Sequence, residues 1–248
     1  MTVKRIHFFT KAVLLILALS NYAVGQVAKP ADSSFVYAAR NQATALYEQT
    51  VKKQAHVYEG NQYINHDPRI KVHPYYRVDS LQIGTVIYKG VAYRDVAMLY
   101  DIVRDELVVQ PPEGGYRLRL ITDKISAFTL GRSQFARLIG DSLAGIRTGF
   151  YELIYDGKTK VLAKRAKTIH EDISSGTYKG DYVQGDRYLI QKEKSVYEIK
   201  TKRSLLNLFP DQTKELRKYI RASRLKFKDD QRENTITRIT QRYDELMR

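Results

Sequence analysis

The alternation of apolar and polar residues between about residues 70 and 200 constrains the fold of this chain more than any other feature. Tyr116, Leu118 and Leu120 alternate with two arginines, which is typical of a β-strand with one buried face. About nine or ten such runs follow one another, most of them joined by short turns. This pattern predicts an antiparallel β-meander curled into a barrel or sandwich.

Short turn sequences divide these runs into hairpins. Lys89-Gly90 lies between two runs, and Asp156-Gly157 lies between two more. Because glycine adopts a positive φ without strain, we expect a positive φ at Gly157. A third hairpin is expected around residues 192–195. Segments rich in Gly, Ser and Asp are expected to be loops, at residues 140–149 and 171–186.

Helical periodicity flanks the β region on both sides. A weak apolar stripe predicts a helix over residues 35–54. After the last strand, a short apolar turn ends at Pro210, and a helix is expected from Asp211. Another helix is expected to start at Asp230, with Glu233 completing a capping box. The chain is therefore predicted to be an α+β protein with an N-terminal helix and a C-terminal helical hairpin.

The first 25 residues have the three parts of a secretory signal peptide. Three basic residues precede an apolar run over residues 12–19, and Ala23 and Gly25 predict cleavage before Gln26. A helix needs about 20 residues to span a bilayer, so this run is too short to do so. An uncleaved anchor is the alternative interpretation.

These patterns divide the chain into four segments. They are a signal peptide (1–25), an N-terminal lead and helix (26–69), an antiparallel β domain (70–200) and C-terminal helices packed on the β domain (201–248). No second segment approaches 18 apolar residues, so we expect no transmembrane segment after processing. The chain has no cysteine, so disulfides cannot stabilise it after export. We expect it in the periplasm or at the cell surface.

Basic residues are concentrated near the C-terminus. The chain has 42 Lys and Arg against 27 Asp and Glu, and cleavage before Gln26 leaves 39 against 27. Residues 192–232 alone hold 13 basic and six acidic residues. The apolar positions of this region are expected to dock the helices onto the protein; they are residues 205, 206, 208, 209, 216, 219 and 220.

The basic positions beside this apolar face form the candidate binding site. They are Arg217, Lys218, Arg221, Arg224, Lys226 and Lys228. Their charge predicts contact with an anionic surface, either envelope lipid or envelope polysaccharide. A solvated face of a packed helix is the alternative interpretation. The sequence disfavours nucleic acid as a partner, because it shows neither an RNA-binding aromatic motif nor a helix-turn-helix signature.

Two short sequences resemble catalytic motifs but lack the partners that the chemistry needs. GDSL at residues 140–143 matches the block that names the GDSL esterases, yet the only later histidine, His170, lacks the Asp three positions before it. GKT at residues 157–159 resembles the end of a phosphate-binding loop, but Glu152 stands where that loop requires glycine. We therefore expect Ser142 and His170 not to be catalytic partners.

The remaining histidines do not form a metal motif. His56, His66, Asp67 and His73 are the only cluster of metal-ligand types, and the histidines lie ten and seven residues apart, whereas zinc sites usually contain closer pairs. The sequence predicts no catalytic residue, no metal site and no cofactor. The leading hypothesis is a non-enzymatic envelope protein with a binding or scaffolding role. The alternative is an exported hydrolase whose site is assembled from dispersed histidines and carboxylates.

Several sequence blocks, together with the signal peptide, resemble an uncharacterised family of exported Bacteroidetes proteins. These blocks are YEGNQY (58–63), YKGVAY (88–93), AMLYDIVRDELVV (97–109), GFYELIYDGKTKVLAKRAK (149–167) and SLLNLFPDQTKELRKYIRASRLKF (204–227). The resemblance covers most of the mature chain and implies a bacterial envelope setting. That family has no assigned activity, so the resemblance implies no functional residues.

Overall fold

The structure is a computed structural model that describes residues 56–140, 145–172, 174, 178–228 and 230–248. These residues belong to one compact unit of the chain. The expected signal peptide, the expected N-terminal helix and Ser142 lie outside the described residues. Within the described part, no helix combines the length and the apolar character needed to cross a membrane.

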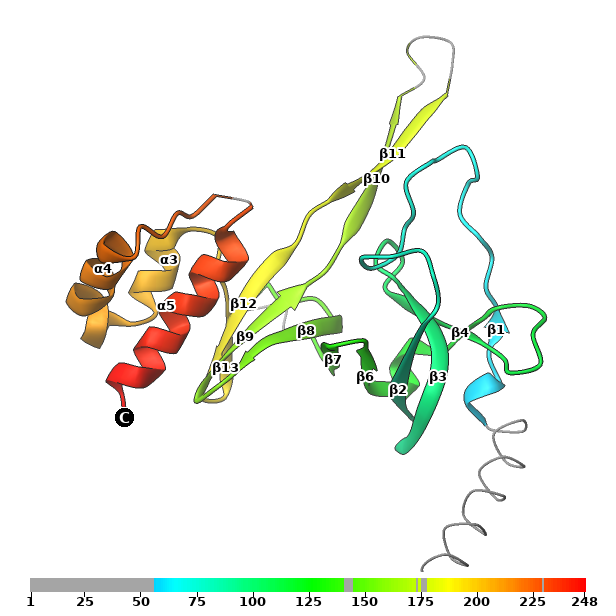
Figure 1. The fold of residues 1–248 in the computed structure, drawn as a ribbon, viewed down its shortest axis with the longest axis horizontal. Coiled ribbons are helices and arrows are strands. Elements are labelled where there is room, and N and C mark those ends of the chain that lie inside the picture. The colour runs from blue at the N-terminus through cyan, green and yellow to red at the C-terminus, as the bar shows by residue number, and fades with distance from the viewer. Residues whose placement is uncertain (1–55, 141–144, 173, 175–177, 229) are drawn as a thin grey trace, which may run out of the picture. The chain divides into compact units, whose positions relative to one another are not determined.

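Antiparallel β-sheet is the main secondary structure of the described residues (Figure 1). The strands are β1 (Asn61–Gln62), β2 (Gln82–Tyr88), β3 (Val91–Asp101), β4 (Glu106–Gln110), β5 (Leu118–Arg119), β6 (Ile125–Leu130), β7 (Ser133–Leu138), β8 (Gly149–Asp156), β9 (Thr159–Lys164), β10 (Lys167–Asp172), β11 (Lys179–Gln184), β12 (Arg187–Lys192) and β13 (Ser195–Glu198). In the described residues, eleven of them form one sheet in the order β1-β5-β4-β3-β2-β6-β7-β8-β9-β12-β13. The other two, β10 and β11, pair with each other.

The predicted α+β class is confirmed, but the predicted closure into a barrel is wrong. β1 and β13 form the two edges of the sheet order and do not pair with each other. The buried side chains form separate clusters, one around Tyr100 and Phe128 and another between the sheet and the C-terminal helices around Phe209 and Ile239. Because helices cover the second part of the sheet, its apolar face is buried without closure.

Both predicted glycine hairpins form. Between β2 and β3, Lys89 and Gly90 have φ of 52° and 79°, as expected for a type I′ turn. The β8–β9 hairpin is also confirmed, but the predicted positive φ at Gly157 is wrong. A Cβ at Gly157 would instead collide with Tyr155 Oη and Asp244 Oδ2. Lack of space, rather than backbone conformation, therefore explains this glycine.

In the segment expected to be a loop at residues 171–186, most of the residues that the structure describes are in strands. β10 and β11 form a hairpin that continues β9 and β12 (Figure 1). The segment before β2 packs on this hairpin: the His66 and Tyr182 rings meet edge to face at 5.6 Å, and Arg69 lies 3.8 Å from the Tyr178 ring centre. These contacts stabilise strands whose Gly and Asp content is typical of loops.

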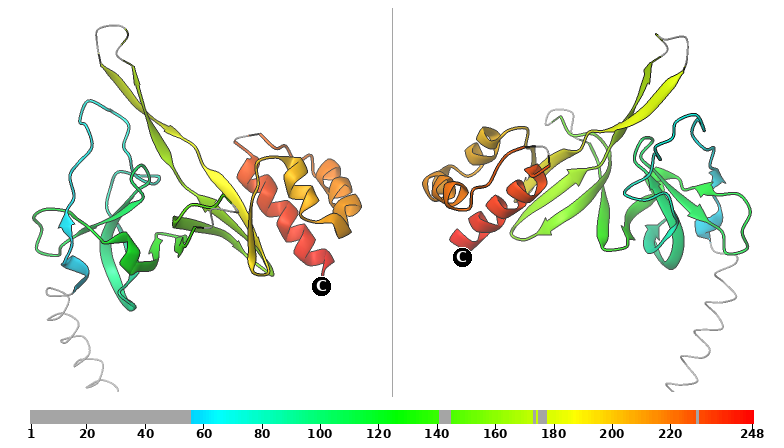
Figure 2. Two further views of the ribbon diagram at one scale, coloured as in Figure 1. Left: turned by 180° about the vertical axis from the view of Figure 1, so that it is seen from behind. Right: turned by 45° about the horizontal axis from the view of Figure 1, so that its top comes forward.

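Three helices follow the last strand: α3 (Lys202–Asn207), α4 (Thr213–Ala222) and α5 (Arg232–Leu246). α5 packs on β8 and β9, and α4 packs on α5 and α3 (Figure 2). The capping box predicted for α5 at Asp230 is wrong, since Gln231 is the N-cap and makes no side-chain cap. A capping box is found at α3 instead, where the side chains of Thr201 and Ser204 bond each other's backbone N–H.

Candidate functional site

An apolar cluster fixes the C-terminal helices to the sheet. The expected docking positions are confirmed as buried or half-buried: Leu205, Leu206, Leu208, Phe209, Leu216, Tyr219 and Ile220. Phe209 stacks on Tyr243 of α5, with ring centres 4.0 Å apart. The Thr213 hydroxyl, at the start of α4, donates to the Phe209 carbonyl at 2.9 Å. The spacing between α3 and α4 is therefore set by the core and by a hydrogen bond.

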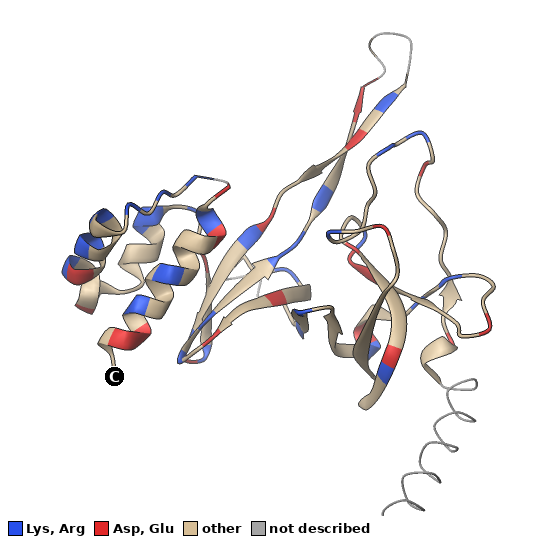
Figure 3. Cartoon of the chain, viewed as in Figure 1, with Lys and Arg blue, Asp and Glu red and all other residues tan. Residues whose placement is uncertain are grey.

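The opposite face of this helical layer carries positive charge. Figure 3 shows basic residues gathered on α4 and on the segment that follows it. All six predicted site positions are exposed: Arg217, Lys218, Arg221, Arg224, Lys226 and Lys228. Within the described part of the chain, none of these six side chains has a hydrogen-bond or ion-pair partner. Their charges are therefore available to a ligand.

A pocket of about 520 Å³ lies between α3 and α4. Its lining residues are Lys202, Arg203, Leu206, Asn207, Arg217, Ile220 and Arg221. Four of the seven are basic and none is acidic. Among the described residues, these four basic side chains also lack an ion-pair partner. We call this feature the α3–α4 pocket.

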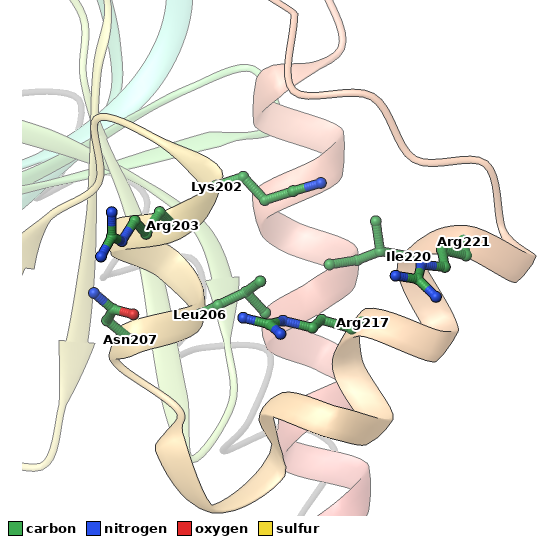
Figure 4. Close-up of a pocket in the computed structure, with 7 residues that line it drawn as sticks. All are labelled: Lys202, Arg203, Leu206, Asn207, Arg217, Ile220 and Arg221. Atoms are coloured by element: carbon green, nitrogen blue, oxygen red, sulfur yellow. The ribbon is translucent and has the colours of Figure 1, made fainter.

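The basic groups enter the α3–α4 pocket from both helices. In Figure 4, Arg217 extends from α4 toward Leu206 of α3, and Lys202 extends from α3 on the side that faces α4. Arg221 lies beside Ile220, one turn along α4 from Arg217. The arrangement surrounds an apolar floor with separated positive charges.

Of the six predicted positions, the structure brings two into the pocket. Arg217 and Arg221 line it, whereas Lys218, Arg224, Lys226 and Lys228 lie outside its lining. The sequence pattern did not indicate Lys202, Arg203 or Asn207, which also line the pocket. Lys202 and Arg203 belong to the same basic segment, residues 192–232, but only the tertiary structure shows that they line a pocket with Arg217.

Arg224 occupies a special backbone position. Its φ is 51°, directly after the α4 C-cap Ser223. The Leu225 N–H bonds the Ile220 carbonyl and the Arg224 N–H bonds the Arg221 carbonyl, which is a Schellman motif. Glycine is the usual residue at this position, so an arginine here adds positive charge at some conformational cost.

A buried arginine shows the opposite arrangement of charge. Arg165, 6% exposed, bonds three carboxylates: Glu152 at 2.6 Å, Asp186 at 2.6 Å and Glu233 at 2.7 Å. Burial disfavours its charge, but these carboxylates outweigh burial and raise the pKa of Arg165. Glu152 also accepts a hydrogen bond from the Tyr76 hydroxyl at 2.7 Å. This cluster ties β8 and β9 to α5, so it stabilises the fold.

A second buried cluster contains the best His–carboxylate pair for the hydrolase hypothesis. His66 Nε2 lies 2.6 Å from Asp101 Oδ2, which also accepts from the Tyr63 hydroxyl at 2.9 Å. Asp101 Oδ1 accepts the backbone N–H groups of Val103 and Arg104, at 2.9 and 3.0 Å. The carboxylate therefore holds the β3–β4 turn and the segment before β2, which is a structural role.

The other metal-ligand types lie apart. His56 bonds Glu59 at 2.7 Å, Asp67 bonds the Arg69 side chain and His73 stacks on Tyr75. His170 lies on β10, opposite Asp181 of β11. In the part of the chain that the structure describes, no three His, Cys, Asp or Glu side chains gather as ligands of one metal ion.

No protein-family model matches this chain, and no curated protein or solved structure matches it significantly.

Proposed function

We propose that this chain is an exported, non-enzymatic protein of the bacterial envelope that binds an anionic surface through its C-terminal helices. The observation that carries this proposal is the row of exposed basic side chains on α3, α4 and the segment after α4, which lack carboxylate partners among the described residues. Unpaired surface charge attracts ligands of opposite sign and speeds their association.

The distribution of charge supports binding rather than general solubility. Elsewhere in the described chain, isolated unpaired cations such as Lys158 occur among paired ones, as in Arg69–Asp67, Arg119–Glu106 and Arg187–Glu198. Near the C-terminus the basic residues of α3 and α4 lack such partners in the described structure. A solvated helix face would need only scattered charges of both signs.

Sequence features support the envelope setting. The N-terminal 25 residues have the pattern of a cleaved signal peptide, and the sequence blocks resemble exported Bacteroidetes proteins. Anionic lipid headgroups are an abundant anionic surface in that setting, and each basic residue near such a surface contributes about 1 kcal/mol.

Co-sedimentation with phosphatidylglycerol vesicles tests the proposal. The mature chain should bind at low salt and dissociate as salt rises, because the Debye length falls to about 8 Å at physiological ionic strength. Changing Arg217, Arg221 and Arg224 to Gln should weaken binding at low salt by at least tenfold, since it removes about 3 kcal/mol of attraction. Neutral phosphatidylcholine vesicles should bind neither protein.

A matched variant controls for net charge. Lys71, Lys158 and Lys194 are exposed and lack ion-pair partners among the described residues, and they lie outside the C-terminal helices. Changing these three to Gln removes the same charge and should leave most of the vesicle binding. Equal losses for the two triple variants, or binding that ignores salt, would reject the proposal.

A further inference from the structure

The α3–α4 pocket offers hydrogen-bond donors and almost no acceptors. Lys202, Arg203, Arg217 and Arg221 carry positive charge and can only donate hydrogen bonds. Asn207 is the one lining side chain that can also accept. A ligand that matches this lining must be anionic and rich in acceptor oxygens.

The placement of the cations selects the shape of the anion. Lys202 belongs to α3, whereas Arg217 and Arg221 belong to α4, so the donors come from two walls (Figure 4). A carboxylate presents two oxygens in one plane, which suits a single arginine fork. A phosphate presents oxygens in three directions and can be bonded from both walls at once. The arrangement therefore favours a phosphate group.

The rest of the pocket is too large and too apolar for phosphate alone. Its volume of about 520 Å³ is in the range that holds a small organic ligand. Leu206 and Ile220 form the floor between the cations (Figure 4). The carbon atoms of an esterified polyol could cover this floor, and Asn207 could bond one of its hydroxyl groups.

The walls of the pocket are held in place before a ligand binds. Leu206 and Ile220 belong to the buried cluster that also contains Phe209 and Leu216. The Thr213 hydroxyl, at the start of α4, lies 3.4 Å from the Leu206 carbonyl of α3 and donates to the Phe209 carbonyl just after α3. Fixed walls lower the entropy that binding must overcome, so a small ligand can bind here as a discrete site.

We propose that the α3–α4 pocket binds the phosphate-ester headgroup of an envelope molecule, with glycerol or a sugar as the esterified polyol. This inference rests on the proposed function, because it assigns a chemical class to one site within the basic surface. Lys202, Arg217 and Arg221 bind the phosphate, Leu206 and Ile220 contact the polyol carbons, and Asn207 bonds a hydroxyl group.

Calorimetric titration with glycerol 3-phosphate tests the pocket directly. Ionic strength is held constant with sodium chloride, so that general screening does not change. The wild-type mature chain should bind one equivalent. The Arg217→Gln/Arg221→Gln variant should bind at least tenfold more weakly, because each substitution removes a charge-assisted hydrogen bond to the phosphate.

A second pair on the same helix is the matched comparison. Lys214 and Lys218 have the same i,i+4 spacing on α4 and are exposed, but they do not line the pocket. The Lys214→Gln/Lys218→Gln variant should change glycerol 3-phosphate affinity by less than threefold. Both pairs should weaken binding to phosphatidylglycerol vesicles, since both reduce the charge of the surface.

The outcomes separate this inference from the proposed function. Salt-dependent vesicle binding without glycerol 3-phosphate binding would overturn the proposed phosphate-ester site and leave the proposed binding to an anionic surface in place. Equal effects of the two pairs of substitutions on glycerol 3-phosphate affinity would have the same meaning. Glycerol 3-phosphate binding without vesicle binding would support the pocket for a soluble phosphate ester and reject the surface. Competition between glycerol 3-phosphate and vesicles would identify a lipid headgroup as the source.

Discussion

Two regions of this molecule use arginine in opposite ways. Arg165 is buried between the sheet and α5, and each of its three guanidinium nitrogens contacts a carboxylate. Arg217 and Arg221 are exposed beside the α3–α4 pocket and lack carboxylate partners in the described structure. The first arrangement satisfies the charge within the fold, and the second leaves it for a ligand.

The contrast between the buried and the exposed arginines indicates where function should be sought in this chain. A buried charge must be paired, because its desolvation costs roughly several kcal/mol. This requirement holds whatever the protein binds. An exposed charge needs no partner, so a group of unpaired charges around one pocket carries information about ligands. Substitutions in the two regions should therefore separate stability from binding.

The largest expected effect is at Arg165. Arg165→Met would leave the buried carboxylate of Glu152, which is 3% exposed, with only the exposed Arg77 guanidinium, 3.7 Å away, as a cation. We expect the free energy of unfolding to fall by about 3–5 kcal/mol in urea denaturation. Adding Glu152→Gln should recover part of this loss, because it removes a buried charge that has lost its 2.6 Å partner.

The matched change in the other region is Arg217→Met. It should alter the free energy of unfolding by less than about 0.5 kcal/mol, as is usual for exposed positions. If Arg165→Met cost no more than Arg217→Met, the distinction between structural and binding arginines would be wrong.

The next effect concerns how α5 is held to the β8–β9 hairpin. Asp244 Oδ2 accepts the Thr159 N–H at 3.0 Å and the Tyr155 hydroxyl at 3.1 Å, and the Gly157 backbone lies against both side chains. Gly157→Ala should lower the free energy of unfolding by about 1–3 kcal/mol through this collision. In thermal melts, the double variant Gly157→Ala/Tyr155→Phe should lose less stability than the sum of the two single variants. Strict additivity would show that the added methyl group does not collide with the Tyr155 hydroxyl.

How far the sequence could predict this fold depends on whether a feature is local. The Lys89-Gly90 turn and the docking face of α4 follow from neighbouring residues, and both were predicted correctly. The β10–β11 hairpin was missed because Tyr182 is buried by His66, more than a hundred residues earlier. Barrel closure was wrong because the pattern of single strands does not show which part of a sheet helices will cover.

The candidate site shows the same division. The charge surplus of residues 192–232 indicated Arg217 and Arg221 from sequence alone. The pocket itself depends on the turn through Phe209 and Thr213, which brings Lys202 to face α4. Nothing in the spacing of these residues predicts that approach, because it is set by packing on the sheet.

A smaller effect should appear at alkaline pH in the buried region. Burial raises the pKa of Tyr188 to about 12. An unfolded tyrosine loses its proton near pH 10, so between pH 10 and 12 the native state holds more protons and its stability falls as pH rises. Tyr188→Phe should reduce this slope by up to about 1.4 kcal/mol per pH unit in urea denaturation.

Arg217→Gln provides the comparison for the alkaline slope. The Arg217 side chain is exposed, and its substitution leaves Tyr188 unchanged. The slope of stability against pH should therefore match that of the wild type. An unchanged slope in Tyr188→Phe would mean that this hydroxyl ionises as readily in the native state as in the unfolded chain.

The smallest expected effect is at Arg224. Arg224→Gly should raise the free energy of unfolding by about 0.5–1 kcal/mol, because glycine adopts the positive φ of this position without strain. The same change should weaken binding to anionic vesicles, since it removes one charge from the surface. The melting temperature should then rise while the fraction bound in co-sedimentation falls. A loss of stability would show that the Arg224 side chain supports the fold.

Lysine footprinting by mass spectrometry tests whether the basic surface of the C-terminal helices is the part of the chain that binds anionic vesicles. Acetylation rates of individual lysines are measured with and without phosphatidylglycerol vesicles, at low and high salt. We expect the vesicles to protect Lys202 and Lys218 at low salt, while Lys158 and Lys194 are modified as fast as before. Protection of Lys158 and Lys194 instead, or equal modification of all four lysines with vesicles bound, would contradict this expectation.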